Sequence, residues 1–147
     1  MAALYLLDTN ILVHYVRGGA LQQQIEQSYQ LYLTPEVPLI SYVTEAELRS
    51  LAIQFGWGPA KRTQLSYLLG TFRRIPIEEP QILEAYAEID AYSVAQGFEL
   101  GKNDVWIAAT AHVTGAVLLT TDKDFNHLDG KFLQRIWIDP SLPISTP

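Results

Sequence analysis

The sequence contains no cysteine. Disulfide bonds, iron–sulfur clusters and thiolate metal sites are therefore excluded, which is consistent with a reducing compartment. No stretch approaches the roughly 18 consecutive apolar residues of a membrane-spanning helix, and no basic region precedes an apolar segment at the N-terminus. Internal repeats and low-complexity tracts are also absent. From these absences we expect a cytoplasmic protein without a membrane attachment.

Positive charge is scarce as well. The chain has 10 Lys and Arg residues against 16 Asp and Glu residues, which gives a formal net charge of −6. An acidic protein does not coat nucleic acid non-specifically. The excess of acid does not exclude an enzyme that acts on nucleic acid, because a bound metal ion can supply the positive charge.

The chain is long enough for a sizeable hydrophobic core. Its 147 residues, of which 48% are hydrophobic, indicate one ordinary globular domain. We expect this domain to span residues 1–140 and to be followed by a loosely structured tail at residues 141–147.

Short apolar segments alternate with segments of helical periodicity. Strands are predicted at Leu4–Leu7, Leu39–Ser41, Arg73–Ile77, Ala116–Leu119 and Arg135–Ile138. Helices are predicted at Thr9–Arg17, Leu21–Tyr32, Thr44–Phe55, Pro59–Thr71 and Pro80–Gln96, and from Asn103 to just before Gly115. This alternation predicts an α/β fold whose parallel sheet is covered on both faces. Functional groups in such sheets gather at the carboxyl ends of the strands.

Acidic residues lie at four places where a predicted strand ends or a predicted helix begins. Asp8 follows the first predicted strand in "LYLLDTNIL", and Glu47 lies near the start of the helix after the second strand in "VTEAEL". Asp104 lies in the first turn of the helix that begins at Asn103, in "GKNDVWIAAT". Asp122 follows the fourth strand in "LLTTDKDF", with Asp124 two residues later.

Each acid also has a local structural explanation. Asp8 or Thr9 could cap the following helix, and Thr44 with Glu47 matches a capping box. Asp104 could interact favourably with a helix dipole, with Asn103 as the cap of that helix, and Asp122 could close an Asx turn.

A common site explains all four acids together. Carboxylates that converge repel one another, and some of them take up protons unless a cation lies between them. Clustered oxygen ligands suit Mg²⁺ or Mn²⁺ better than zinc. Such an ion favours phosphodiester hydrolysis, in which it activates water and offsets charge on the phosphate.

Four segments carry a family resemblance. In this order, "LLDTNIL", "SYVTEAEL", "NDVWIAATA" and "LLTTDKDF" resemble the PIN-domain family, and in particular its VapC-type toxin ribonucleases, over residues 4–125. The resemblance implies a three-layer α/β/α sandwich with a mostly parallel sheet of four to five strands. It also implies Mg²⁺- or Mn²⁺-dependent cleavage of single-stranded RNA, a homodimer, and inhibition by a small antitoxin partner.

The resemblance assigns roles to individual residues. The catalytic and metal-binding acids of the family fall on Asp8, Glu47, Asp104 and Asp122. The supporting positions beside them fall on Thr9, Asn10, Thr120 and Asp124.

Two of these assignments leave alternatives. Helical geometry alone does not favour Glu47 over Glu45, since both flank the apolar stripe of their helix, and the choice depends on the "A-E-L" match. Asp122 fits the "T-x-D" pattern, whereas Asp124 could bind through water or take its place.

Other residues and functions compete with this interpretation. Lys102 and Lys123 could contact RNA phosphates or be ordinary surface lysines. Three aromatic residues, Trp57, Tyr67 and Trp106, could stack on bases. The histidines are interpreted as structural, with His14 and His112 in predicted helices and His127 in a predicted loop. An aspartate-based phosphohydrolase would need a second acid where the sequence has Asn10. A PIN-like module that only binds a partner is the non-enzymatic alternative.

Overall fold

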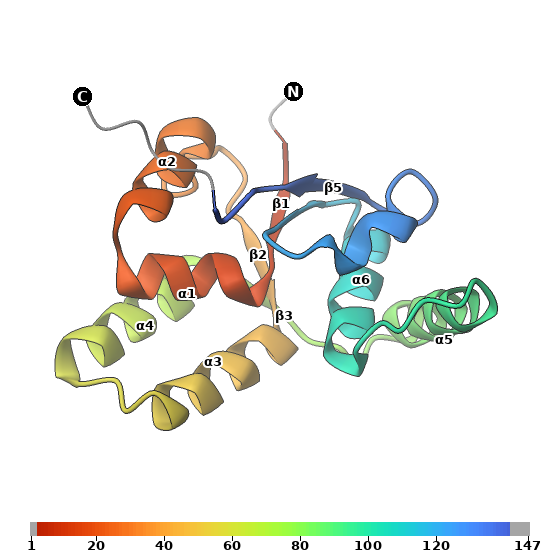
Figure 1. Ribbon diagram of the computed structural model, residues 1–147, viewed down its shortest axis with the longest axis horizontal. Helices are drawn as coiled ribbons and strands as arrows, with labels where there is room; N and C mark the ends of the chain where they lie inside the picture. The colour runs from red at the N-terminus through yellow and green to blue at the C-terminus, as the bar shows by residue number, and fades with distance from the viewer. Residues whose placement is uncertain (1–2, 142–147) are drawn as a thin grey trace.

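The computed structural model describes residues 3–141 and contains a parallel five-stranded sheet with the order β3-β2-β1-β4-β5 (Figure 1). The strands are β1 (Tyr5–Leu7), β2 (Leu39–Ser41), β3 (Arg73–Ile75), β4 (Val117–Thr120) and β5 (Gln134–Trp137). The predicted parallel α/β sheet is thus confirmed. The predicted tail at residues 141–147 lies outside the described residues except for Ser141.

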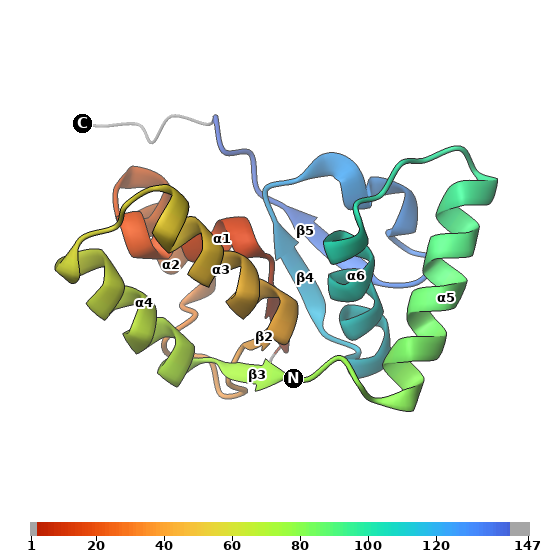
Figure 2. The ribbon, with the colours of Figure 1, turned by 90° about the horizontal axis from the view of Figure 1, so that it is seen from below.

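Helices cover both faces of the sheet. They are α1 (Thr9–Arg17), α2 (Ala20–Tyr29), α3 (Tyr42–Gln54), α4 (Pro59–Thr71), α5 (Pro80–Ala95), α6 (Lys102–Thr114) and the 3₁₀-helix η1 (Lys123–Leu128). Figure 2 shows α1 to α4 on one side of the sheet and α5 with α6 on the other, which confirms the three-layer α/β/α arrangement. Within residues 3–141, no helix has the length and apolar content needed to cross a membrane.

The central strands alternate their side chains between two hydrophobic cores. Leu6 pairs with Leu118 and packs in the core formed with α5 and α6. Leu7 pairs with Leu119 and packs in the core formed with α1, α3 and α4. Because a shift of one residue would exchange the two faces, burial on both sides fixes the register of β1 against β4. The residues that follow these strands are therefore fixed relative to each other.

Helices α3 and α6 begin earlier than the sequence predicts. The Ser41 side chain accepts a hydrogen bond from the Val43 amide at 3.0 Å and caps α3, which therefore starts at Tyr42. Thr44 lies inside the helix, so the predicted capping box with Glu47 is wrong. Likewise, α6 starts at Lys102 with Gly101 as its cap, and Asn103 is not the cap.

Two other segments also differ from the prediction. The second helix ends at Tyr29, where Gln30 adopts a left-handed conformation, rather than at Tyr32. The segment that contains His127 was expected to be a loop and forms η1, with Phe125 and Leu128 fully buried. A short 3₁₀-helix lacks the 3.6-residue periodicity that identifies α-helices in a sequence.

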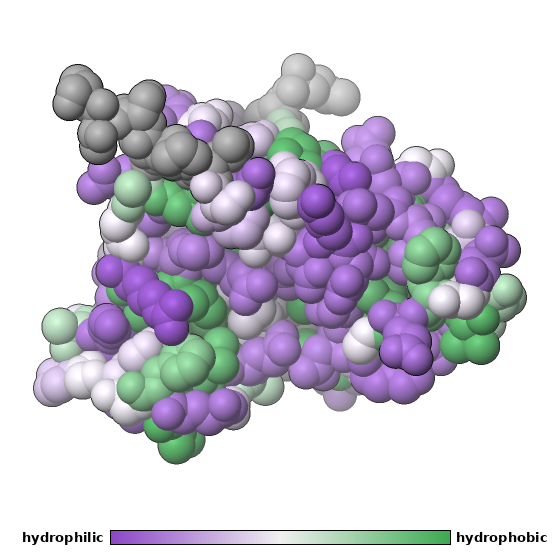
Figure 3. All heavy atoms as spheres, viewed as in Figure 1, coloured by the Kyte–Doolittle hydropathy of each residue, from purple (hydrophilic) through white to green (hydrophobic). Residues whose placement is uncertain are grey.

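Polar side chains cover most of the face shown in Figure 3, with apolar patches near the corner between α3 and α4 and at the far end of α5. Exposed apolar side chains include Ile53 and Phe55 near the corner between α3 and α4, and Val94 and Phe98 at the far end of α5.

Candidate functional site

The adjacent ends of β1 and β4 fix the position of Asp8. Its amide donates to the Leu119 carbonyl at 3.0 Å. Its Oδ1 accepts a hydrogen bond from the Thr9 amide at 2.8 Å, and its Oδ2 accepts one from the Thr120 hydroxyl at 2.7 Å. Asp8 therefore caps α1, as its local explanation predicts, and is only 4% exposed. Both oxygens of this buried carboxyl are held in a fixed orientation.

The structure distinguishes the two glutamates of α3. Glu47 Oε1 accepts a hydrogen bond from the Thr9 hydroxyl at 2.6 Å, and Oε2 accepts one from the Asn103 side-chain amide at 3.3 Å. Glu45 instead forms ion pairs with Arg49 and Arg74, each with an N–O distance of 2.7 Å. Glu47 thus lies beside the residues around Asp8, whereas the arginines hold Glu45 in a separate ion-pair group.

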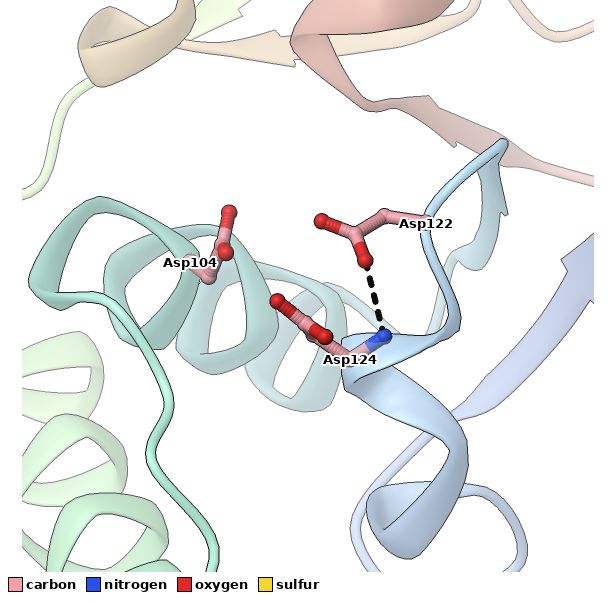
Figure 4. A group of neighbouring side chains, drawn as sticks. All are labelled: Asp104, Asp122 and Asp124. Atoms are coloured by element: carbon pink, nitrogen blue, oxygen red, sulfur yellow. Dashed lines mark hydrogen bonds between the residues drawn. The ribbon is translucent and has the colours of Figure 1, made fainter.

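Three aspartates from α6 and η1 lie close together, as Figure 4 shows. Carboxylate oxygens of Asp104, Asp122 and Asp124 all lie within 4.8 Å of one another. Asp122 also forms the expected Asx turn, since its Oδ1 accepts a hydrogen bond from the Asp124 amide at 2.9 Å. Both alternatives for the fourth acid are therefore near Asp104.

A cleft of about 680 Å³ joins these groups. Two predicted site residues, Thr120 and Asp124, do not line the cleft themselves but contact acids that do. The Thr120 hydroxyl donates a hydrogen bond to Asp8 and accepts one from the Asp122 amide, and the Asp124 amide donates one to the Asp122 side chain. The structure thus brings all the predicted site residues into one region. The predicted residues that line the cleft are Asp8, Thr9, Asn10, Glu47, Asp104 and Asp122.

Burial and mutual repulsion raise the pKa values of the central acids. Desolvation is the largest cause for Asp8 and raises its pKa to about 6; the hydrogen bonds from Thr120 and Thr9 lower it, and the charges of Asp122 and Glu47 raise it further. Without a cation, this carboxyl holds its proton over a pH range in which an exposed aspartate is ionised.

The pKa of Asp104 rises to about 7, with desolvation as the largest cause and the charges of Asp8, Asp122, Glu47 and Asp124 as the others. Asp104 is thus close enough to the other acids for their charges to raise its pKa. Carboxylate oxygens from several elements are the ligands that Mg²⁺ and Mn²⁺ prefer, and the residues present therefore fit such an ion.

Two polar residues of this region were not predicted. Asn103 was interpreted as a helix cap, yet its amide donates to Glu47. Thr44 is fully buried, and its hydroxyl lies 3.2 Å from that of Thr9. In the sequence, the only sign that Asn103 belongs to the site was its position directly before Asp104. That position is equally consistent with a helix cap.

The candidate base-stacking and phosphate-binding residues differ in accessibility. Trp57 is 5% exposed and cannot stack on a base, whereas Tyr67 is exposed. Trp106 packs against Tyr86 with ring centroids 4.1 Å apart. Lys102 pairs with Asp90, and Lys123 lies over the ring of Trp137, so both lysines already have partners.

Comparisons with known proteins identify the fold family. The family model described as "PIN domain" matches residues 5–131. A comparison with curated proteins finds no match.

Several solved structures are similar. FitAcB from Neisseria gonorrhoeae has 28% identity and a TM-score of 0.74, covering 95% of this chain and 100% of that chain. VapBC-1 from nontypeable Haemophilus influenzae has 27% identity and a TM-score of 0.74, covering 91% and 97%. A toxin-antitoxin complex from Klebsiella pneumoniae has 28% identity and a TM-score of 0.61, covering 82% and 89%. Together with the fold and the family match, these likenesses show that the chain belongs to the PIN-domain family and is similar to its VapC-type members.

Proposed function

We propose that this protein is a divalent-metal-dependent endoribonuclease that cleaves single-stranded regions of RNA, and that it is the toxin of a toxin–antitoxin pair. The observation that carries the proposal is the convergence of Asp8, Glu47, Asp104 and Asp122 on one cleft, although they lie far apart in the chain. Membership of the PIN-domain family and similarity to VapBC-1 support the same function.

The four acids would hold Mg²⁺ or Mn²⁺, with Asp124 completing the site or replacing Asp122. When bound, such an ion activates water and offsets the charge that develops on the phosphate. Thr9 and Thr120 orient the Asp8 carboxylate through their hydrogen bonds, and Thr9 with Asn103 orients Glu47. Hydrogen bonds of this kind fix the direction in which ligand oxygens point.

The lining of the cleft supports dependence on a cation. In the part of the chain that the structure describes, no Lys or Arg lines the cleft. An RNA phosphate that entered the cleft of the metal-free protein would meet several carboxylates and no positive side chain. We therefore expect that RNA binds weakly at this site unless a divalent ion is present.

Two alternative functions remain to be separated from this proposal. An aspartate-based phosphohydrolase needs a second acid two residues after Asp8, and Asn10 occupies that position at the cleft. A non-catalytic binding module would have no need for neighbouring acids whose charges raise the pKa values of Asp8 and Asp104.

The decisive experiment compares RNA cleavage by wild-type protein and by Asp8→Asn with Mn²⁺, with Mg²⁺ and with a chelator. We expect the wild type to cleave single-stranded RNA only with a divalent ion, and Asp8→Asn to lose at least a hundredfold in rate, by about 2.7 kcal/mol or more in activation free energy. Asp129→Asn, which alters an exposed aspartate bonded to the Arg135 amide, is the matched control. Equal cleavage by wild type and Asp8→Asn would contradict the proposal.

The toxin role requires an inhibiting partner. We expect a small antitoxin that binds this chain and blocks cleavage in the cytoplasm, and the toxin-antitoxin complex from Klebsiella pneumoniae among the similar structures supports this expectation.

A further inference from the structure

His127, near the end of η1, connects this helix to α5. Its Nε2 lies 2.8 Å from the hydroxyl oxygen of Ser93. Ser93 belongs to the buried face of α5 and is 1% exposed. A substrate cannot reach this hydroxyl, so the Ser93–His127 pair is not a nucleophile and its base. The hydrogen bond joins two elements.

Aromatic rings fix the orientation of the His127 imidazole. The Phe98 ring stacks on it with centroids 4.2 Å apart and planes 15° apart. The Tyr92 ring lies nearly parallel to it, with centroids 6.4 Å apart and planes 9° apart. Phe98 follows α5 and Tyr92 belongs to it. The imidazole therefore contacts the C-terminal part of α5 both by stacking and by a hydrogen bond.

The same imidazole interacts with Asp124, one turn earlier in η1. Burial is the largest cause acting on the pKa of His127 and lowers it, while a backbone hydrogen bond with Asp124 and the charge of Asp124 raise it. A neutral imidazole has one donor and one acceptor nitrogen. Asp124 on one side and Ser93 on the other are therefore enough to satisfy both ring nitrogens.

The geometry of the acid cluster depends on where η1 lies. Asp104 belongs to α6, whereas Asp122 and Asp124 belong to the turn that begins η1. Helices of the 3₁₀ type are short and have poorer hydrogen-bond geometry than α-helices, so η1 needs tertiary contacts to keep one position. Two of its apolar side chains are buried in the core, and His127 adds the polar contact with α5.

We propose that His127 is a positioning residue that fixes η1 against α5 through Ser93 and thereby sets the distance of Asp122 and Asp124 from Asp104. The inference rests on the proposed function, because it concerns the affinity of the acid cluster for a divalent ion. Residues that orient metal ligands through hydrogen bonds typically contribute about 10- to 100-fold to metal affinity. His127 acts through backbone and neighbouring groups, so the lower end of this range is expected.

The test measures Mn²⁺ affinity by calorimetry on the full chain without RNA. Ser93→Ala and His127→Phe both remove the hydrogen bond and keep an aromatic ring stacked on Phe98. We expect both variants to bind Mn²⁺ about tenfold more weakly than wild type, with unchanged circular dichroism. In His127→Gln the side-chain amide can still reach Ser93, and this variant should recover most of the affinity.

His112→Phe is the matched control, because its Nδ1 also makes one hydrogen bond, to the Phe132 carbonyl at 2.6 Å, near the opposite end of α6 from Asp104. It should bind Mn²⁺ as wild type does. Equal affinity in wild type, Ser93→Ala and His127→Phe would overturn the inference and leave the proposed function standing. If His127→Phe does not fold, Ser93→Ala decides. A wild-type protein that binds no Mn²⁺ would overturn the proposed function and the inference with it.

Discussion

Asp8 combines two roles that are usually separate. As the cap of α1 it satisfies a helix amide, and as a buried acid it faces the charges of Asp122 and Glu47. Capping contributes about 1 kcal/mol to stability, while burial and repulsion oppose folding when the group is ionised. The residue is therefore favourable for stability when it is protonated and unfavourable when it is ionised without a cation.

This opposition predicts the pH dependence of the metal-free protein. The pKa of Asp8 is about 6 in the folded state and near the ordinary aspartate value of 3.8 in the unfolded chain. Between these values the folded state holds a proton that the unfolded state has released, so the free energy of unfolding falls as the pH rises through this window. The slope for one such group approaches about 1.4 kcal/mol per pH unit.

Urea unfolding of wild type and Asp8→Asn in chelator, from pH 4 to pH 8, measures this contribution as the difference between the two proteins. We expect the stability of wild type relative to Asp8→Asn to decrease across the window and then level off. Adding Mn²⁺ at pH 8 should stabilise wild type by mass action. A relative stability that rises with pH would show that Asp8 is not desolvated in this way.

At the scale of elements, α3 carries two glutamates with different surroundings. The pKa of Glu45 is lowered, first of all by its hydrogen bond with Arg74, and this group contributes to a partly exposed ion-pair network. Among residues 3–141, no arginine forms an ion pair with Glu47, which receives hydrogen bonds from Thr9 and Asn103. Glu45 and Glu47 are thus only two positions apart on α3, yet Glu45 belongs to a surface ion-pair group and Glu47 is a carboxylate of the cleft.

The two glutamates predict contrasting variants. We expect Glu47→Gln to lower Mn²⁺ affinity and RNA cleavage at least tenfold, because it removes a charge from the proposed ligand set. Glu45→Gln should leave both unchanged and lower the free energy of unfolding by at most about 1 kcal/mol, the usual range for exposed ion pairs. Calorimetry and a cleavage assay on both variants check this, and the reverse ranking would assign the ligand role to Glu45.

Local sequence signals predicted most helices and strands, but they did not predict where α3 starts or which of its glutamates belongs to the site. The strand at Leu39–Ser41 and the helices at Thr9–Arg17 and Pro59–Thr71 have the predicted bounds. The predicted start of α3 at Thr44 was wrong, because Ser41 is both the last residue of β2 and the cap of α3. The choice between Glu45 and Glu47 could not be made from periodicity, since it depends on Arg74, which is distant in the chain.

At the scale of the whole molecule, charge is distributed unevenly. Between residues 75 and 101 the chain contains no Lys or Arg and includes Glu84 and Glu88, whereas Arg49 and Arg74 lie on the side of α3 and β3. Exposed apolar side chains accompany both regions. Arg49 and Arg74 are already paired with Glu45. The exposed apolar side chains, rather than the charges, therefore make α3 and α5 the surfaces on which we expect two copies to meet.

The predicted homodimer gives a direct test. Ile53 is 73% exposed on α3 and Val94 is 68% exposed on α5. We expect Ile53→Asp and Val94→Asp to weaken dimerisation at least tenfold, because each would bury a charge in an apolar contact. Sedimentation equilibrium measures the effect, and Leu33→Asp alters a similarly exposed residue outside both helices as the control. A wild-type monomer, or unchanged dimers of both variants, would contradict the prediction.

The order of the strands could not be predicted from the sequence. Each strand has its own apolar pattern, but nothing local states that β1 lies between β2 and β4. The convergence of the acids depends on that order, because it brings the residues after β1 and β4 together. The places of the acids at element ends predicted that they converge, but neither the residue pattern nor the family resemblance specified the strand order.

The hydrogen bond between Asp8 and Thr120 joins residues that are 112 positions apart. A ribosome therefore makes β1 and the residue after it well before β4, the strand that completes the hydrogen bonding of β1. Until β4 has been made, a nascent chain carries Asp8 without the groups that hold it at the cleft. Under the proposed function, cleavage of any transcript, including the one being translated, has to wait until β4 and the acids after it have been synthesised.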